Sequence, residues 1–140
     1  MSLQFVDTNV LLYAYDTTAG EKHEQALALV GPLGRTRSGA LSVQVLQEFY
    51  VNAVRKIAEP LPTAVARERV RRLALWPTHS PATNDVLAAI DIAERERLSF
   101  WDAMIIRSAS VLGCQVLWTE DLNPGQVVDG VRIANPFAGA

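Results

Sequence analysis

The sequence predicts an α/β fold, a three-layer sandwich in which a short, mostly parallel central sheet is flanked by helices. Two observations support this fold class: short apolar runs alternate with longer helical patterns, and Gly, Pro or Ser residues separate them. The expected strands are Leu3–Val6, Gly39–Ser42, Thr78–Ser80, Gln115–Trp118 and Val131–Ala134. The expected helices are a helix from Asn9, then Gly20–Val30, Val43–Ile57, Thr63–Leu75, Thr83–Arg97, and Phe100 or Trp101 to Leu112.

Polar and helix-breaking residues delimit the first two helices. The opening strand, LQFV, ends at Asp7, and a helical pattern begins around Asn9. In the helix that follows, the side chains expected to face the core are Ala26, Leu27 and Val30. The glycines and proline at positions 31, 32 and 34 are expected to end that helix. His23 lies among charged residues, which favours a solvated histidine over a metal ligand.

Capping and breaking residues delimit the later elements. Ser42 is a suitable N-cap for the helix from Val43. Prolines at positions 60 and 62 separate this helix from the next one, which Trp76-Pro77 ends. Ser99 is the expected cap of the last helix, and Gly113 ends it. In the preceding helix, the apolar stripe typical of an amphipathic surface helix consists of Val86, Leu87, Ile90 and Ala93.

The length and composition are typical of one globular domain, so residues 1–140 are expected to form a single domain. Hydrophobic residues make up 49% of the chain and charged residues 20%, unlike a disordered protein. Cys114 is the only cysteine, which excludes a disulfide framework and a cysteine-based metal site. No apolar stretch approaches the roughly 18 residues of a membrane span. We therefore expect a cytoplasmic protein without a membrane partner.

The charge distribution is uneven although the net charge is only −2. The cationic residues between Arg55 and Arg72 are Arg55, Lys56, Arg67, Arg69, Arg71 and Arg72, and the acidic ones are Glu59 and Glu68. A solvated helix face with salt bridges is the simplest interpretation of this segment. A surface that contacts phosphates is the alternative, because arginine can bind phosphate through two hydrogen bonds.

Four carboxylates fall where a ligand site is expected in a parallel sheet. Asp7 and Asp121 each follow a predicted strand, and Glu48 and Asp102 lie in early turns of predicted helices. Ligands of open α/β sheets bind outside the carboxyl ends of the strands. If these oxygen ligands meet in one crevice, they suit a hard divalent cation such as Mg²⁺ or Mn²⁺.

Each carboxylate also has a purely structural interpretation. Asp7 and Asp121 resemble turn residues, and Asp102 could stabilise the start of its helix through the helix dipole. Glu48 points away from the apolar stripe of its helix, as a solvated glutamate would. That stripe consists of Val43, Leu46, Tyr50, Ala53, Val54 and Ile57. Only the four acids taken together favour a site.

The order of these acidic segments resembles the PIN-domain ribonucleases, in particular the VapC-like toxins of bacterial toxin–antitoxin pairs. The similar segments are VDTNVLLYAYD, LSVQVLQEFY, LSFWDAMIIRSASVLGC, LWTEDLNPGQ and the closing VRIANPF. Each segment alone is a weak signal, but together they cover almost the whole chain in the family's order. The resemblance implies a PIN-like fold.

Carried over position by position, the resemblance assigns an acidic cluster and two supporting residues. The cluster would be Asp7, Glu48, Asp102 and Asp121, serving as both catalytic and metal-binding residues, with Asn9 and Thr119 in support. Glu48 would then face the site groove rather than bulk water. Glu120 and Asp121 are adjacent and should point apart, so Asp121 is preferred and Glu120 is the possible substitute.

The resemblance further implies a metal-dependent endoribonuclease that hydrolyses RNA phosphodiester bonds with Mg²⁺ or Mn²⁺. Its partners would be an RNA substrate, a cognate antitoxin whose C-terminal segment covers the site, and a second copy in a homodimer. The alternative is a non-catalytic PIN-like module that binds RNA or protein, although such a module would not need all four acids.

Two other enzyme classes receive less support from the residues. A phosphoryl-transfer enzyme of the haloacid-dehalogenase type needs a second aspartate two residues after Asp7, where this chain has Asn9. Serine or cysteine nucleophilic catalysis is not favoured, because His23 and His79 lie in unremarkable contexts and Cys114 lies in an apolar run.

Overall fold

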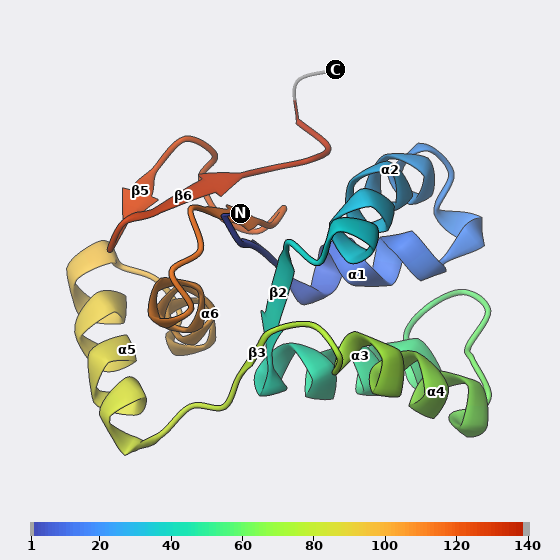
Figure 1. Ribbon diagram of the computed structural model, residues 1–140, viewed down its shortest axis with the longest axis horizontal. Coiled ribbons are helices and arrows are strands. Elements are labelled where there is room, and N and C mark those ends of the chain that lie inside the picture. The colour runs from blue at the N-terminus through green and yellow to red at the C-terminus, as the bar shows by residue number, and fades with distance from the viewer. Residues whose placement is uncertain (1, 139–140) are drawn as a thin grey trace.

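The computed structural model describes residues 2–138, which form a six-stranded sheet with the order β3-β2-β1-β4-β6-β5 (Figure 1). The strands are β1 (Gln4–Val6), β2 (Gly39–Ser42), β3 (Thr78–His79), β4 (Val116–Trp118), β5 (Val127–Val128) and β6 (Val131–Ala134). Only β5 runs antiparallel to its neighbour; the other pairs are parallel. The short, mostly parallel sheet predicted from the sequence is therefore confirmed.

Helices cover both faces of this sheet. They are α1 (Thr8–Tyr15), α2 (Glu21–Thr36), α3 (Val43–Arg55), α4 (Thr63–Leu73), α5 (Thr83–Glu96) and α6 (Phe100–Val111), with a short 3-10 turn at Thr17–Ala19. Helices α1 to α4 gather on one side of the sheet, and α5 and α6 pack together on the other (Figure 1). This confirms the three-layer α/β sandwich. No helix among the described residues has both the length and the apolar character needed to cross a membrane.

Strand β1 lies inside the sheet, between β2 and β4, and its apolar side chains are fully enclosed. Phe5 and Val6 are each 0% exposed, so both faces of the strand contribute to the core. Such burial is typical of a parallel strand covered by helices on both sides. Residues that follow β1 therefore emerge in the middle of the sheet's carboxyl edge.

Helix α2 continues past the point where the sequence predicts its end. It contains Pro32 and stops only at Arg37, which adopts the left-handed conformation with φ of 57°. Proline disfavours a helical conformation of the preceding residue through clashes with that residue's N–H and Cβ. The preceding residue is Gly31, which has no Cβ, so one of these clashes is absent.

The inward faces of two helices also differ from the prediction. Val86, Leu87 and Ile90 of α5 are exposed, whereas Ala89 and Ile92 are buried. Ala89 is small enough to allow a close approach to α6, and Asp85 is turned inward by buried partners. In α2, Leu27 is 50% exposed while Ala26 and Val30 are buried as predicted. Strand β5 and the 3-10 turn are elements that the sequence did not predict.

A buried polar cluster holds α5, α6 and β3 together. Asp85 accepts hydrogen bonds from Arg107 Nε at 2.9 Å and from the backbone N–H of Ala82 at 2.8 Å. His79 lies between this carboxylate, 3.3 Å from Nε2, and Ser108 Oγ, 2.8 Å from Nδ1. The context of His79 is thus not unremarkable, contrary to the prediction. It is nevertheless no serine hydrolase site, because Ser108 is 1% exposed and out of reach of a substrate.

Gly39 provides a sharp test of packing between β2 and the segment after α4. A Cβ built on Gly39 would lie 2.5 Å from Cζ3 of Trp76, so Gly39→Ala must displace the indole. We expect this substitution to lower the free energy of unfolding by about 1–3 kcal/mol.

Gly34→Ala is the matched control, because its Cβ would lie 3.6 Å from the same indole, an ordinary contact. The control should stabilise helix α2 by about 0.5–1 kcal/mol. Urea unfolding of both variants measures the two effects; a stability of Gly39→Ala equal to wild type would contradict this packing.

Candidate functional site

Asp7 lies at the carboxyl end of β1 and begins helix α1. Its Oδ1 accepts a hydrogen bond from the backbone N–H of Thr8 at 2.7 Å, as an N-cap does. Its Oδ2 accepts a second one from the hydroxyl of Thr119 at 2.9 Å, across from the end of β4. The side chain is only 6% exposed. A carboxylate is therefore fixed in orientation and largely shielded from solvent.

The other three predicted acids lie around the same hollow, which has a volume of about 200 Å³. Glu48 comes from α3, Asp102 from the first turn of α6 and Asp121 from the loop after β4. The residues that line the hollow are Asp7, Thr8, Asn9, Leu12, Gln44, Glu48, Asn52, Trp101, Asp102, Ile105 and Asp121. All four predicted carboxylates are thus brought together at the carboxyl edge of the sheet.

Glu48 does not point into bulk solvent. The buried side of α3 is formed by Val45, Phe49 and Ala53, because the helix packs against both α1 and α4. This places Glu48 at the border of the hollow, where its Oε1 accepts a hydrogen bond from the Thr8 hydroxyl at 2.8 Å. The apolar stripe that made Glu48 resemble a solvated residue was therefore centred on the wrong positions.

The surroundings of the hollow disfavour the ionised form of two of its carboxyl groups, Asp7 and Asp102. Burial raises the pKa of Asp7 to about 7, and the neighbouring charges of Glu48 and Asp121 add to this effect. Burial also raises the pKa of Asp102, with a further contribution from Asp121. Several carboxylates that face one another in a partly buried site repel each other. A cation in the hollow would relieve both the repulsion and the loss of solvation.

The residues present fit a hydrated divalent cation. All the charged groups that line the hollow are carboxylates, which are hard oxygen donors suited to Mg²⁺ or Mn²⁺. Within residues 2–138, no three acidic, histidine or cysteine side chains form a ready-made metal cage. Mg²⁺ does not require one, since it commonly keeps several waters and uses only one or two carboxylates. The amides of Gln44 and Asn52 also border the hollow.

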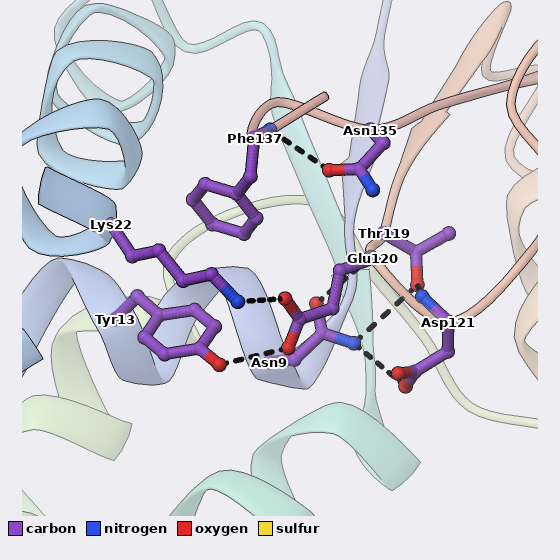
Figure 2. A network of polar contacts seen from close by, with 8 residues as sticks. All are labelled: Asn9, Tyr13, Lys22, Thr119, Glu120, Asp121, Asn135 and Phe137. Atoms are coloured by element: carbon purple, nitrogen blue, oxygen red, sulfur yellow. Dashed lines mark hydrogen bonds and ion pairs between the residues drawn. The ribbon is translucent and has the colours of Figure 1, made fainter. Parts of the chain in front are cut away.

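The two predicted supporting residues connect Asp7 to Asp121. Asn9 Nδ2 donates to Asp121 Oδ2 at 2.8 Å and approaches Thr119 Oγ1 at 3.4 Å (Figure 2). Thr119 Oγ1 also accepts a hydrogen bond from the backbone N–H of Asp121 at 3.2 Å. Because Thr119 in turn donates to Asp7, these contacts hold two acids in one arrangement.

Glu120 and Asp121 point apart, as predicted for adjacent residues in a loop. Asp121 lines the hollow, whereas the carboxylate of Glu120 accepts hydrogen bonds from Tyr13 and Lys22, outside it (Figure 2). The geometry therefore favours Asp121 over Glu120 as the residue available to a ligand.

Six residues that border the hollow were not predicted as site residues: Thr8, Leu12, Gln44, Asn52, Trp101 and Ile105. For two of them a signal was present in the sequence. Gln44, Glu48 and Asn52 are spaced four residues apart and so share one face of α3. Thr8 and Trp101 are each adjacent to a predicted acid, and nothing in the sequence pattern distinguishes them.

Comparison with known proteins identifies the family. The sequence model of the PIN domain matches residues 5–128, which include every residue of the acidic cluster. The chain belongs to the PIN domain family. The haloacid-dehalogenase alternative is thereby set aside. No curated protein matches this PIN domain in sequence.

Solved structures with the same fold align with nearly the entire PIN domain. A toxin–antitoxin complex from Klebsiella pneumoniae contains a chain with a TM-score of 0.68 and 18% identity, covering 96% of this chain and 98% of that one. A chain of the DNA-bound VapBC from Salmonella typhimurium gives a TM-score of 0.65 and 20% identity, covering 97% and 99%. A chain of VapBC2 from Rickettsia felis, bound to a promoter DNA fragment, gives 0.64 and 14%, covering 95% and 98%. At these identities the likeness concerns the fold.

Proposed function

We propose that this PIN domain is a metal-dependent endoribonuclease, with Mg²⁺ or Mn²⁺ held by Asp7, Glu48, Asp102 and Asp121. The observation that carries the proposal is the convergence of these four carboxylates, from four separate segments, on one hollow. A fold that needed none of them for chemistry would gain nothing from gathering like charges in a partly buried place.

The chain's own residues orient the acids and restrict their movement. Thr119 and the backbone of Thr8 fix both oxygens of Asp7, the Thr8 hydroxyl holds Glu48, and Asn9 holds Asp121. When bound, the cation would act as a Lewis acid toward the phosphate and would make a water more nucleophilic. No covalent nucleophile is required from the protein.

Trp101 supports a nucleic acid as the substrate. It borders the hollow beside Asp102 and is 63% exposed, although large aromatic side chains are mostly buried. Exposed aromatic rings next to a nuclease site provide a surface on which an unpaired base can stack. A single-stranded segment or loop of RNA is therefore the substrate that this rim suits best.

Incubation of RNA with the purified protein tests the proposal by addition and removal of metal. We expect discrete cleavage in Mg²⁺ or Mn²⁺, complete loss of cleavage in EDTA, and recovery when excess metal is restored, because the carboxylates alone cannot stabilise the reacting phosphate. Cleavage that persists in EDTA would contradict metal dependence. Binding of RNA without cleavage under all conditions would favour the alternative, a non-catalytic binding module.

We further propose that the protein is the toxin of a toxin–antitoxin pair and forms a homodimer. The support is the alignment of almost the whole chain with chains of toxin–antitoxin complexes. The expected partner is a small antitoxin that covers the carboxylate hollow. Co-purification with the product of a neighbouring small gene, accompanied by loss of RNA cleavage, is the expected result; a complex that cleaves RNA as fast as the free protein would contradict it.

A further inference from the structure

A second polar network lies beside the carboxylate hollow and ends at Glu120 (Figure 2). The carboxylate of Glu120 accepts hydrogen bonds from the hydroxyl of Tyr13 and from Nζ of Lys22, both at 2.9 Å. Its side chain is only 22% exposed, so the carboxylate is neutralised at the protein surface rather than left in water. Asp121, the next residue, has its side chain in the hollow instead.

Lys22 is held by more than this ion pair. Its Nζ lies 5.0 Å from the ring centre of Tyr13 and 5.4 Å from that of Phe137, within the range of cation–π attraction. The two rings meet edge to face with their centres 5.2 Å apart. In Figure 2 the side chain of Lys22 runs alongside both rings and ends at Glu120. Lys22 therefore joins α1, α2, the loop after β4 and the C-terminal segment.

A hydrogen bond within a turn fixes the C-terminal segment. The backbone N–H of Phe137 donates to Asn135 Oδ1 at 2.8 Å. This directs the Phe137 ring toward Tyr13 and Lys22 (Figure 2). The closing Asn-Pro-Phe sequence thus takes part in the contacts around Lys22 rather than in the acidic cluster.

The Lys22 network is connected to the hollow through one short stretch of backbone. The N–H of Glu120 approaches Asn9 Oδ1 at 3.4 Å, and the same asparagine donates to Asp121 Oδ2 at 2.8 Å. The loop is consequently held on two sides, by Glu120 outside the hollow and by Asn9 inside it. Release of the outer contact would leave Asp121 attached through Asn9 and Thr119 only.

We propose that Lys22 is a positioning residue of the carboxylate site: held against the rings of Tyr13 and Phe137, it binds Glu120 and so keeps Asp121 directed into the hollow. The expected effect of Lys22 on metal binding rests on the proposed function, whereas its expected effect on the loop does not. Isolated ion pairs on a surface contribute little. Lys22 is 46% exposed, but it is part of a network, because it contacts two rings and shares the Glu120 carboxylate with the Tyr13 hydroxyl. Lys22 acts through Glu120 and does not contact the substrate.

Three single variants, the double variant Lys22→Met/Glu120→Gln and a control test this role. Lys22→Met removes the cation, Glu120→Gln removes the charge of its partner, and Lys22→Arg keeps a cation that can stack on the rings. Arg71→Met is the matched control, because it breaks another surface ion pair, with Glu68, on the distant helix α4. Each variant is examined by Mn²⁺ titration calorimetry and by amide hydrogen exchange of residues 119–121 without metal. RNA binding and the melting temperature are measured alongside.

We expect Lys22→Met and Glu120→Gln to weaken Mn²⁺ binding by about tenfold each, as loss of partners around metal ligands typically does. The double variant should be no worse than either single one, because both residues act through the same contact. Exchange of the Asp121 amide should be faster in both variants, while Lys22→Arg and Arg71→Met should resemble wild type.

Other outcomes would overturn the inference in distinguishable ways. If Lys22→Met alone weakens RNA binding and Mn²⁺ affinity is unchanged, Lys22 contacts the substrate directly. If the melting temperature falls but exchange at residues 119–121 and Mn²⁺ affinity do not change, the pair is merely structural. If wild-type protein binds no Mn²⁺, the proposed function fails, and unaltered exchange in Lys22→Met would then overturn the positioning role of Lys22 as well.

Discussion

Asp7→Asn is expected to reduce metal-dependent RNA cleavage by at least about a hundredfold, since even the outer partners of metal ligands cost 10- to 100-fold when removed. Asp7 is the most enclosed acid of the hollow, and both of its oxygens are fixed by hydrogen bonds. The substitution keeps the shape of the side chain but removes its charge. Measurement of kcat/KM on RNA in saturating Mn²⁺ tests this, with Asp91→Asn as a control for the same charge change on the exposed side of α5.

The same substitution should stabilise the metal-free protein at alkaline pH. The pKa of Asp7 rises from 3.8 to about 7 on folding, so the folded state binds the proton more tightly than the unfolded chain. Protonated Asp7 therefore stabilises the folded protein in acid, and this contribution is lost as the pH rises through about 7. Asn cannot ionise, but it places a donor where Asp7 has two acceptors. We therefore expect a net gain of about 1–2 kcal/mol at pH 8 and none at pH 4.

Opposite changes in activity and stability distinguish a functional acid from a structural one. A structural Asp7 would make the asparagine variant less stable without metal, and RNA cleavage would fall only in proportion to the unfolded fraction. Urea unfolding in EDTA at pH 4 and pH 8 separates the two cases. Full cleavage activity in Asp7→Asn would contradict the assignment of this residue.

Asp85→Ala is expected to have the largest effect on stability, lowering the free energy of unfolding by about 3 kcal/mol at pH 7. The substitution leaves Arg107 and His79 without their shared carboxylate and the Ala82 N–H without an acceptor. The pKa of Asp85 is lowered chiefly by the Ala82 hydrogen bond, and also by Arg107 and His79. Its contribution is therefore present above the ordinary pKa of an aspartate and is lost as the pH falls through the lowered value.

The difference between wild type and Asp85→Ala should accordingly be largest near neutral pH and should shrink in strong acid. Urea unfolding at pH 7 and at pH 3 measures both values. Asp91→Ala, on the exposed side of the same helix, should change stability by less than about 0.5 kcal/mol. Equal effects of the two substitutions would show that the buried cluster around Asp85 does not hold α5 against α6.

The central strand and the strand-end positions of Asp7 and Asp121 were predictable because they depend on local chemistry. An apolar run that ends at an aspartate specifies a buried strand and a polar strand end, and Ser42 and Ser99 do cap their helices as predicted. The parallel arrangement then brings Asp7 and Asp121 to one edge. For these features a pattern of a few residues contains enough information.

The features that the sequence did not reveal depend on which elements meet in space. Glu48 resembles a solvated residue until α1 and α4 are both packed on α3. The outward stripe of α5 is exposed because Asp85, a charged residue, is paired in the interior. That Glu120 points away from Asp121 was predicted, but its partners Lys22 and Tyr13 were not. None of these partners is close in the sequence.

A crystal structure with Mn²⁺, using its anomalous scattering, would test the metal site most directly. We expect a peak in the hollow, with an oxygen of Asp7 and one of Asp102, Asp121 or Glu48 at the usual coordination distance of about 2.1 Å. The peak should disappear in Asp7→Asn and persist in Asp91→Asn. A hollow without a peak at saturating Mn²⁺, or a peak bound only by residues elsewhere, would contradict the claim that these carboxylates form the metal site.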